Sequence, residues 1–320
     1  MRVLVIIAIA FFIFSCEKKE LPVKKYDRGD LITTQVDMGS DYRRQVWFSL
    51  NDNKIVSVNL KSAWDLAFEA SADGYHVLLN GAKAVKIYKT AFTSLAQVTD
   101  TAGIGINGKA DMPSGNLDST AIGDWKSDNK VYIINRGYNE SGFQQGFYKL
   151  KISAVTATQF VFDYGDIYGS EIFHGIVTKD PAYSFIMFSL TDNQQKQIEP
   201  KRSEFDFCFT QYTHLFISPL QYYQVTGVVT DLGTRVFSIK DKPFNDIVIS
   251  DTLGRTVNEA KNAIGYDWKE FNLDNNVYTV NPKFCYVIRD KKGFYYKLHF
   301  IDFVNTAKEK GFPKFEFKKL

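Results

Sequence analysis

The sequence contains few of the residue types that usually carry chemistry. Three cysteines, four histidines and four methionines are spread over 320 residues. So few cysteines exclude a dense disulfide framework, and none of them has the paired spacing of a zinc site. The net charge is only +3, and the basic residues are not gathered in one stretch. This excludes the electrostatic footprint of a nucleic-acid-binding protein.

Sequence patterns for catalysis are also missing. The chain has no Gly-X-Ser-X-Gly elbow and no His-Glu-X-X-His string. Residues 103–108 are rich in glycine, but no helix is expected after them, which favours a loop over a phosphate cradle. Asp65 and Asp206 each lack the second carboxylate that a general acid and base would need. These absences predict a protein that is not an enzyme.

The first residues predict the compartment. Val3 to Phe14 is an apolar run of twelve residues, too short to span a bilayer as a helix of about 20 residues. It therefore favours a removed signal segment. Because Ile13 to Cys16 resembles a bacterial lipobox, we expect residues 1–16 to be a lipoprotein signal with a lipid on Cys16, and residues 17–30 to be a tether. The alternative is an ordinary secretory signal. The expected location is the outer membrane of a bacterial envelope, on a face that the sequence does not indicate.

Two further cysteines remain if Cys16 carries a lipid. Cys208 and Cys285 both lie within apolar, strand-like runs. An oxidising envelope would permit a disulfide between them. Since the first half of the chain has no counterpart pair, two buried free thiols are favoured.

The chain is rich in aromatic residues, with 27 Phe and 18 Tyr, while Leu-rich 3.6-residue periodicity is scarce. Short apolar or alternating runs lie between Asn, Asp and Gly, which is typical of strands joined by turns. The expected class is all-β with mainly antiparallel sheets. Residues 92–120 predict a long loop, and residues 256–264 and 306–311 are the only plausible short helices.

Two halves of the chain contain similar strings in the same order. The four matched pairs are Phe48–Asn53 with Phe188–Asn193, Trp64–Phe68 with Phe205–Phe209, Ala121–Lys126 with Ala263–Lys269, and Gly146–Ile152 with Gly293–Phe300. Their separation of about 140 residues is too long for a solenoid repeat but suits a whole domain. We therefore expect two tandem β domains, at residues 31–165 and 166–320.

Several strings resemble the HmuY family of envelope lipoproteins from Bacteroidetes-type bacteria. The likeness lies in Tyr42–Leu50, Trp64–Phe68, Phe205–Phe216, Trp268–Phe271 and Phe284–Arg289. These are strand and hairpin strings rather than catalytic motifs. The resemblance implies an all-β lipoprotein in two tandem HmuY-like copies.

The same resemblance implies a function, because characterised members of the family scavenge haem or related tetrapyrroles for iron uptake. We therefore expect a membrane-anchored, non-catalytic protein that captures haem or another apolar small molecule. The alternative is an envelope lipoprotein with a structural or protein-interaction role that has lost the family haem site. An aromatic cluster in one cleft would favour the first, and a broad apolar face would favour the second.

Haem requires axial donors, usually a histidine nitrogen or a methionine sulfur, together with apolar walls. The resemblance implies a histidine pair, but no histidine lies between His214 and His299, so this pair is absent. Three candidate donors remain: Met112 in the long loop, His174 in the segment that links the halves, and His214 in a strand. A structural role is the alternative for each.

Overall fold

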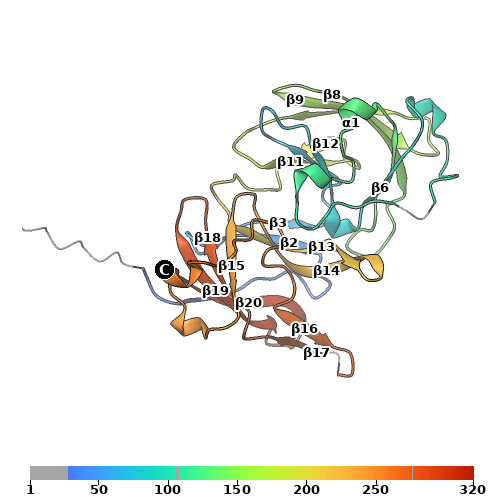
Figure 1. Ribbon diagram of the computed structural model, residues 1–320. Helices are drawn as coiled ribbons and strands as arrows, with labels where there is room; N and C mark the ends of the chain where they lie inside the picture. The colour runs from blue at the N-terminus through green and yellow to red at the C-terminus, as the bar shows by residue number, and fades with distance from the viewer. Residues whose placement is uncertain (1–27, 106–107, 276) are drawn as a thin grey trace, which may run out of the picture.

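The computed structural model describes residues 28–105, 108–275 and 277–320, and its strands form two lobes (Figure 1). We call them the middle lobe, with strands from residues 66–196, and the terminal lobe, with strands from residues 32–60 and 207–319. All strand pairs in the four large sheets are antiparallel, which confirms the expected all-β class.

The middle lobe consists of two sheets packed face to face. The outer sheet has the order β10 (Phe173–Thr178), β9 (Gln159–Asp166), β8 (Phe147–Val155), β7 (Tyr132–Asn135) and β6 (Lys86–Lys89). The inner sheet has the order β12 (Gln194–Lys196), β11 (Phe185–Ser189), β4 (Leu66–Glu69) and β5 (Val77–Leu79).

The terminal lobe repeats this arrangement. Its inner sheet has the order β14 (Leu220–Thr230), β13 (Phe207–Ile217), β2 (Arg44–Ser49) and β3 (Lys54–Leu60). Its outer sheet has the order β1 (Ile32–Gln35), β20 (Lys310–Lys319), β19 (Tyr295–Val304), β18 (Cys285–Arg289) and β15 (Arg235–Ile239). A separate hairpin joins β16 (Lys269–Asn272) and β17 (Val277–Val280).

The central strands β2, β4 and β11 and the first half of β13 are buried on both faces, whereas the edge strands β3 and β12 are largely exposed. Successive side chains of a buried strand point to opposite sides. In β13, Phe207 and Phe209 enter the core of the terminal lobe, whereas Cys208 enters a third cluster that joins the lobes. In β11, Phe188 enters the middle-lobe core and Met187 enters the joining cluster. The molecule is therefore four sheets deep, and the central inner strands β2, β4 and β11 are rich in apolar residues.

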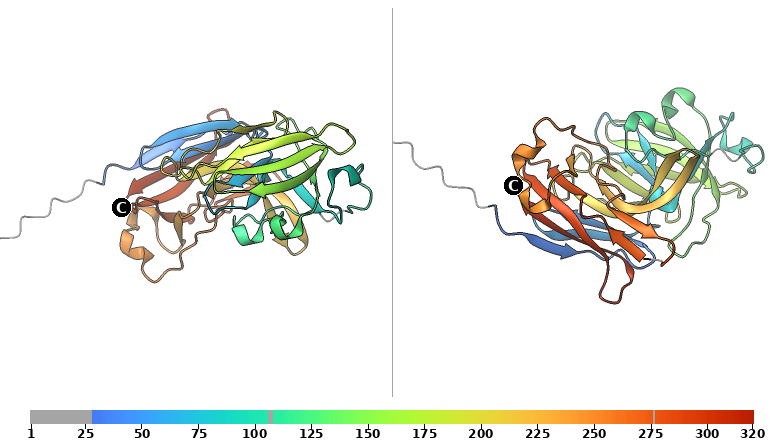
Figure 2. Two further views of the ribbon diagram at one scale, coloured as in Figure 1. Left: turned by 90° about the horizontal axis from the view of Figure 1, so that it is seen from above. Right: turned by 60° about the horizontal axis from the view of Figure 1, so that its bottom comes forward.

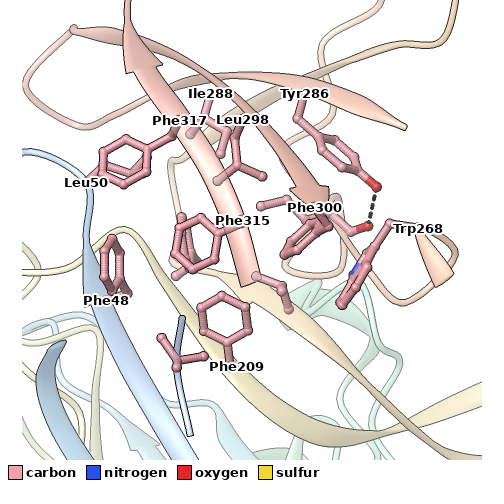
Figure 3. Packing of buried hydrophobic residues seen from close by; sticks show 14 of the residues in the cluster. Phe48, Leu50, Phe209, Trp268, Tyr286, Ile288, Leu298, Phe300, Phe315 and Phe317 are labelled. Carbon is pink, nitrogen blue, oxygen red and sulfur yellow. Dashed lines mark hydrogen bonds between the residues drawn. The ribbon is translucent and has the colours of Figure 1, made fainter. Parts of the chain in front are cut away.

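Aromatic contacts fill the core of the terminal lobe (Figure 3). Trp268 stacks on Phe300 with 3.8 Å between ring centroids, and Phe209 lies 5.4 Å from Phe315. Each such pair contributes about 0.5–1.5 kcal/mol beyond the burial of its area. This core fixes the strands that carry the site described below.

Strand pairing crosses the expected boundary between residues 165 and 166. β1 pairs with β20, β2 with β13, and β4 with β11, so strands from both halves share sheets in each lobe (Figure 2). The division into 31–165 and 166–320 therefore does not describe which strands share a sheet. The matched strings nonetheless occupy corresponding places, since the inner sheets run β12-β11-β4-β5 and β3-β2-β13-β14. Each lobe therefore contains strands from both halves of the chain, held together by backbone hydrogen bonds between segments that are distant in the sequence.

Both expected helices are wrong. Residues 256–264 form no helix because the chain is held at Asn258, which pairs with Val236 through two backbone hydrogen bonds. Residues 306–311 turn and enter β20. In the described chain the helical pieces are α1 (Trp125–Asp128), η1 (Gly81–Lys83), η2 (Leu95–Gln97), η3 (Leu117–Ser119), η4 (Phe244–Asp246) and η5 (Ile249–Thr252). The described part of residues 92–120 is the expected loop, apart from η2 and η3.

Cys208 and Cys285 are free thiols, buried in two different clusters. Burial raises the pKa of Cys208, and it raises the pKa of Cys285 to about 11. The predicted signal segment with Cys16 lies outside the described residues. No helix within the described ranges is long and apolar enough to cross a bilayer.

Candidate ligand-binding cleft

A hollow of ≈ 860 Å³ lies in the terminal lobe between the β13–β14 hairpin and the β16–β17 hairpin. We call it the aromatic cleft. Its volume lies within the range of about 300–1,000 Å³ that is typical of small-molecule sites. Seven aromatic side chains line it, namely Tyr42, Phe216, Tyr223, Tyr266, Phe271, Tyr278 and Phe284.

Two hairpins hold opposite walls of the cleft. In the first, Phe216 and Tyr223 lie with ring centroids 5.9 Å apart. In the second, Phe271 and Tyr278 are direct partners across β16 and β17, with centroids 4.8 Å apart. Both hairpins extend to the same side of the terminal lobe, at the right in Figure 1. The register of each hairpin therefore places its rings together.

Both hairpin tips carry exposed aliphatic side chains. Ile217 and Leu220 at the first tip are 84% and 75% exposed, and Leu273 at the second is 81% exposed. Exposed aliphatic side chains of this size are unfavourable in water unless something covers them. Their position beside the cleft favours an occupant that is itself apolar.

Lys269 supplies a buried amine to the cleft lining. Its Nζ donates a hydrogen bond to the carbonyl oxygen of Thr226 and lies 4.6 Å and 4.8 Å from the ring centroids of Trp268 and Phe303. Burial lowers the pKa of Lys269 to about 7, although the Asp267 carboxylate opposes this shift. Near neutral pH the amine is therefore present in both its charged and its neutral form.

His214 is the one sequence candidate that lies beside the cleft. Its imidazole ring packs edge-on against Phe216 and Tyr266, with centroids 4.9 Å and 5.2 Å away, and both of those rings line the cleft. His214 also pairs across the strands with Tyr223. It supports the wall of the cleft from behind.

The other two candidates lie elsewhere. Met112 is half exposed and lines a separate cavity of ≈ 130 Å³ between the lobes, beside Trp47 and Trp64. His174 lies in β10 rather than in a linker, and its Nδ1 is 2.7 Å from the carboxylate of Asp163 on the neighbouring strand. The three candidates are therefore not gathered in one site.

No sequence motif marks the residues that build the cleft. Tyr223 and the pair Tyr266 and Lys269 come from two separate segments, and each has the sequence surroundings of an ordinary strand or loop residue. The sequence contains one indication of the cleft, because Lys269 lies between the aromatic residues Trp268 and Phe271. A lysine inside such a string is a candidate for a buried, functional amine.

Comparison with known proteins gives one family and several structures of low similarity. The family described as HmuY protein matches residues 41–317 in a single match that includes both halves of the chain. Apo PinO from Porphyromonas gingivitis is 10% identical, with 91% of this chain and 98% of that chain covered and a TM-score of 0.38.

Two further structures are each 12% identical. A protein from Bacteroides vulgatus described as HmuY-like and haem-binding matches over 91% of this chain and 95% of that chain, with a TM-score of 0.23. An apo HmuY analog from Tannerella forsythia matches over 92% and 98%, with a TM-score of 0.25. No curated protein matches the chain.

Proposed function

The chain belongs to the HmuY family, and from this premise we propose that it captures a tetrapyrrole such as haem in the aromatic cleft. The observation that carries the proposal is the set of seven aromatic side chains around ≈ 860 Å³. Flat conjugated rings stack favourably on aromatic side chains, and a macrocycle requires apolar walls. The resemblance read from the sequence implies the same class of ligand.

An iron-containing ring fits the cleft only if a side chain of the lining can coordinate the iron. No histidine or methionine lines the cleft within the described chain, whereas Tyr223 and Tyr266 bring phenol oxygens to its walls. Tyrosine is the axial ligand in one class of haem protein. Burial and Asp267 raise the pKa of Tyr266, which disfavours its phenolate. We therefore assign Tyr223, which is half exposed, as the candidate that would hold the iron, and the aromatic rings as the groups that would hold the macrocycle.

We also infer that the capture domain is tethered to the outer membrane. The support is the sequence of residues 1–30, with the lipobox-like string that ends at Cys16 and the polar segment after it. Two acyl chains on one residue anchor a protein stably. The inferred role is binding and delivery of the ligand, as the resemblance to the family implies.

A haemin titration of the chain lacking residues 1–16, followed by the Soret band, tests the proposal. We expect a saturable, shifted band with one equivalent per chain. Replacing both Phe216 and Phe271 by Ala should weaken binding about tenfold or more, because two stacking rings are lost. Phe143→Ala, an exposed aromatic of the middle lobe, is the matched control and should bind as the wild type does. A signal that does not saturate would overturn the proposal.

The second candidate function is docking to an envelope protein. The exposed tips at Ile217, Leu220 and Leu273 favour it, because a partner could cover them. Iron-free protoporphyrin separates the two functions. Saturable binding of this ring supports capture, whereas its failure together with that of haemin would leave partner docking ahead.

A further inference from the structure

A smaller hollow of ≈ 190 Å³ lies against the aromatic cleft, and we call it the polar chamber. Tyr266, Asp267 and Phe284 line both hollows, so they form a shared wall. In contrast to the cleft, the chamber is lined largely by polar groups. They include Tyr212, His214, Ser238, Lys240, Asn258 and Asn262.

Two buried polar atoms of this lining have no partner. The Tyr212 hydroxyl and the His214 Nδ1 atom make no hydrogen bond to any described residue, and Tyr212 is only 7% exposed. The two residues are two positions apart on β13, so their side chains leave the same face of the strand. Burying such groups without a partner is unfavourable.

Other buried tyrosines of this protein do not show this feature. The hydroxyl of Tyr286 donates to the carbonyl oxygen of Ile264 at 3.1 Å, and that of Tyr164 donates to the carbonyl oxygen of Leu190 at 3.2 Å. Tyr286 lines the same chamber as Tyr212. The unpaired hydroxyl of Tyr212 is therefore a property of its position and not of buried tyrosines in this fold.

Charged groups of both signs stand at the rim of the chamber. Lys240 and Asp267 are both exposed, and the Lys240 ammonium lies 3.8 Å from the ring centroid of Phe284 in the shared wall. Their charges offset each other, so the polar groups inside the chamber determine which ligand group it accepts. A tyrosine hydroxyl and an imidazole N–H both donate hydrogen bonds, which favours a ligand group with acceptor oxygens.

We propose that the polar chamber receives a carboxylate arm of the molecule that the aromatic cleft holds, with the Tyr212 hydroxyl and the His214 Nδ1–H donating to its oxygens. The inference rests on the proposed function and narrows the ligand to a planar apolar molecule that carries a carboxylate on a flexible side chain. Tyr212 and His214 are then residues that determine specificity, whereas the rings of the cleft supply affinity.

Paired ligands and variants test the proposal in the chain lacking residues 1–16. Haemin has free carboxylates, and haemin dimethyl ester has them blocked. We expect the wild type to bind haemin about tenfold more tightly than the ester, because a hydrogen bond to a charged group is lost. Tyr212→Phe and His214→Phe should each reduce this preference severalfold, because each removes one donor to the carboxylate. Tyr138→Phe, an exposed tyrosine of the middle lobe, is the control.

The outcomes separate the two proposals. If both ligands bind and the preference is the same in the wild type and both variants, the chamber inference is overturned while the proposed function stands. If neither ligand binds, the proposed function fails, and the chamber is tested alone by titrating propionate while the NMR signals of the His214 imidazole are followed. A saturable shift that Tyr212→Phe abolishes supports the carboxylate site, and no shift overturns it.

Discussion

Two aspartates at matching places in the two lobes show how the same local structure can carry different electrostatics. Asp65 precedes β4 and accepts a hydrogen bond from the backbone N–H of Leu190 at 2.8 Å, while Asp206 precedes β13 and accepts one from Leu50 at 2.6 Å. Each carboxylate thus ties the start of one inner strand to the turn after its neighbour. This structural task accounts for both aspartates without catalysis.

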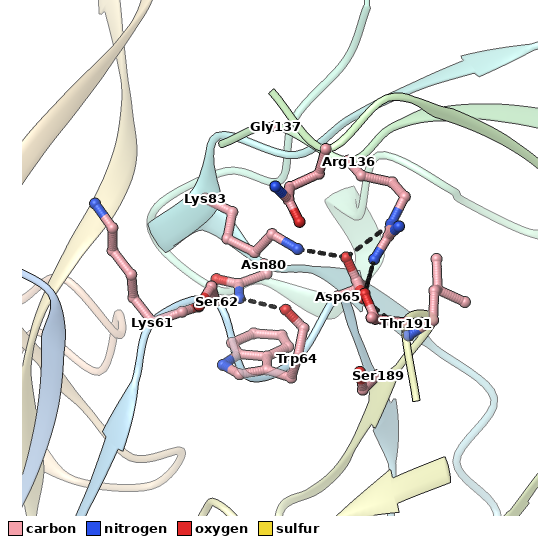
Figure 4. Close-up of polar contacts among 12 residues, drawn as sticks. Lys61, Ser62, Trp64, Asp65, Asn80, Lys83, Arg136, Gly137, Ser189 and Thr191 are labelled. Atoms are coloured by element: carbon pink, nitrogen blue, oxygen red, sulfur yellow. Dashed lines mark hydrogen bonds and ion pairs between the residues drawn. The ribbon is translucent and has the colours of Figure 1, made fainter. Parts of the chain in front are cut away.

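The surroundings of the two carboxylates differ sharply. Asp65 is paired with the buried side chains of Lys83 and Arg136, at 2.5 Å and 3.2 Å (Figure 4). Asp206 has no such direct pair among the described side chains, and burial raises its pKa to about 6. The repeated position therefore requires a carboxyl group as a hydrogen-bond acceptor, while direct ion pairs compensate its charge at Asp65 and only more distant lysines do so at Asp206.

The largest change in stability is expected when each aspartate is replaced by the neutral asparagine. Asp65→Asn leaves two buried cations without their partner and should lower the free energy of unfolding by about 3–5 kcal/mol. Asp206→Asn removes a poorly compensated charge but weakens one hydrogen bond, so at pH 7 its effect should stay within about 1 kcal/mol. Urea denaturation of both variants measures the difference. Equal losses would contradict the comparison.

Lys269 extends the comparison to a buried cation that has no direct carboxylate partner among the described residues, in contrast to Lys83. Its pKa is lowered to about 7 in the folded protein, below the ordinary value of about 10.4. Between these values the unfolded chain binds the extra proton, so stability should rise with pH from about 7 to 10, by about 3 kcal/mol. Lys269→Met should abolish this rise. Parallel stability curves for the two proteins would contradict the lowered pKa.

The raised pKa of Asp206 predicts the opposite slope in an acidic window. Between about pH 4 and 6 the folded protein holds a proton that the unfolded chain has lost, so stability should fall as the pH rises through this window. The expected change is about 2 kcal/mol. The curve of Asp206→Asn lacks this contribution, so its stability relative to the wild type should increase from pH 4 to 6. A constant difference across the window would show an ordinary pKa.

These contrasts also explain how much the sequence could predict. The string Trp64–Phe68 marks a strand and its repeat Phe205–Phe209 marks another, because apolar residues between turns are a local signal. No local sequence pattern predicts that β2 lies beside β13, since the pairing of strands depends on contacts between distant segments. Lys83 has the ordinary appearance of a surface lysine, and only the fold brings it to Asp65.

The cleft was hidden for a similar reason. Its lining combines Tyr42, Phe216 and Tyr266, which are far apart in the chain and meet only after their segments have packed. Residue type alone predicts His214, Met112 and His174 equally well as donors to iron. The sequence does not show which side chains surround each of them in the folded protein.

The smallest expected effect comes from the one position at which the turn strings Phe48–Asn53 and Phe188–Asn193 differ. Thr191 accepts a hydrogen bond from Arg136 and so extends the charge network of Asp65. The matching Asn51 is exposed, and its side chain contacts Asp52 and Tyr296 instead. Thr191→Val should cost about 1 kcal/mol, because a charged donor loses one acceptor.

Asn51→Ala is the matched control and should stay within about 0.5 kcal/mol, as is usual for an exposed side chain. In an Asp65→Asn background the cost of Thr191→Val should change, since both residues bond to Arg136 and are therefore coupled. A double-mutant cycle by urea denaturation measures this coupling. Strict additivity would mean that Thr191 acts on the turn alone, and that the cation network of the middle lobe ends at Arg136.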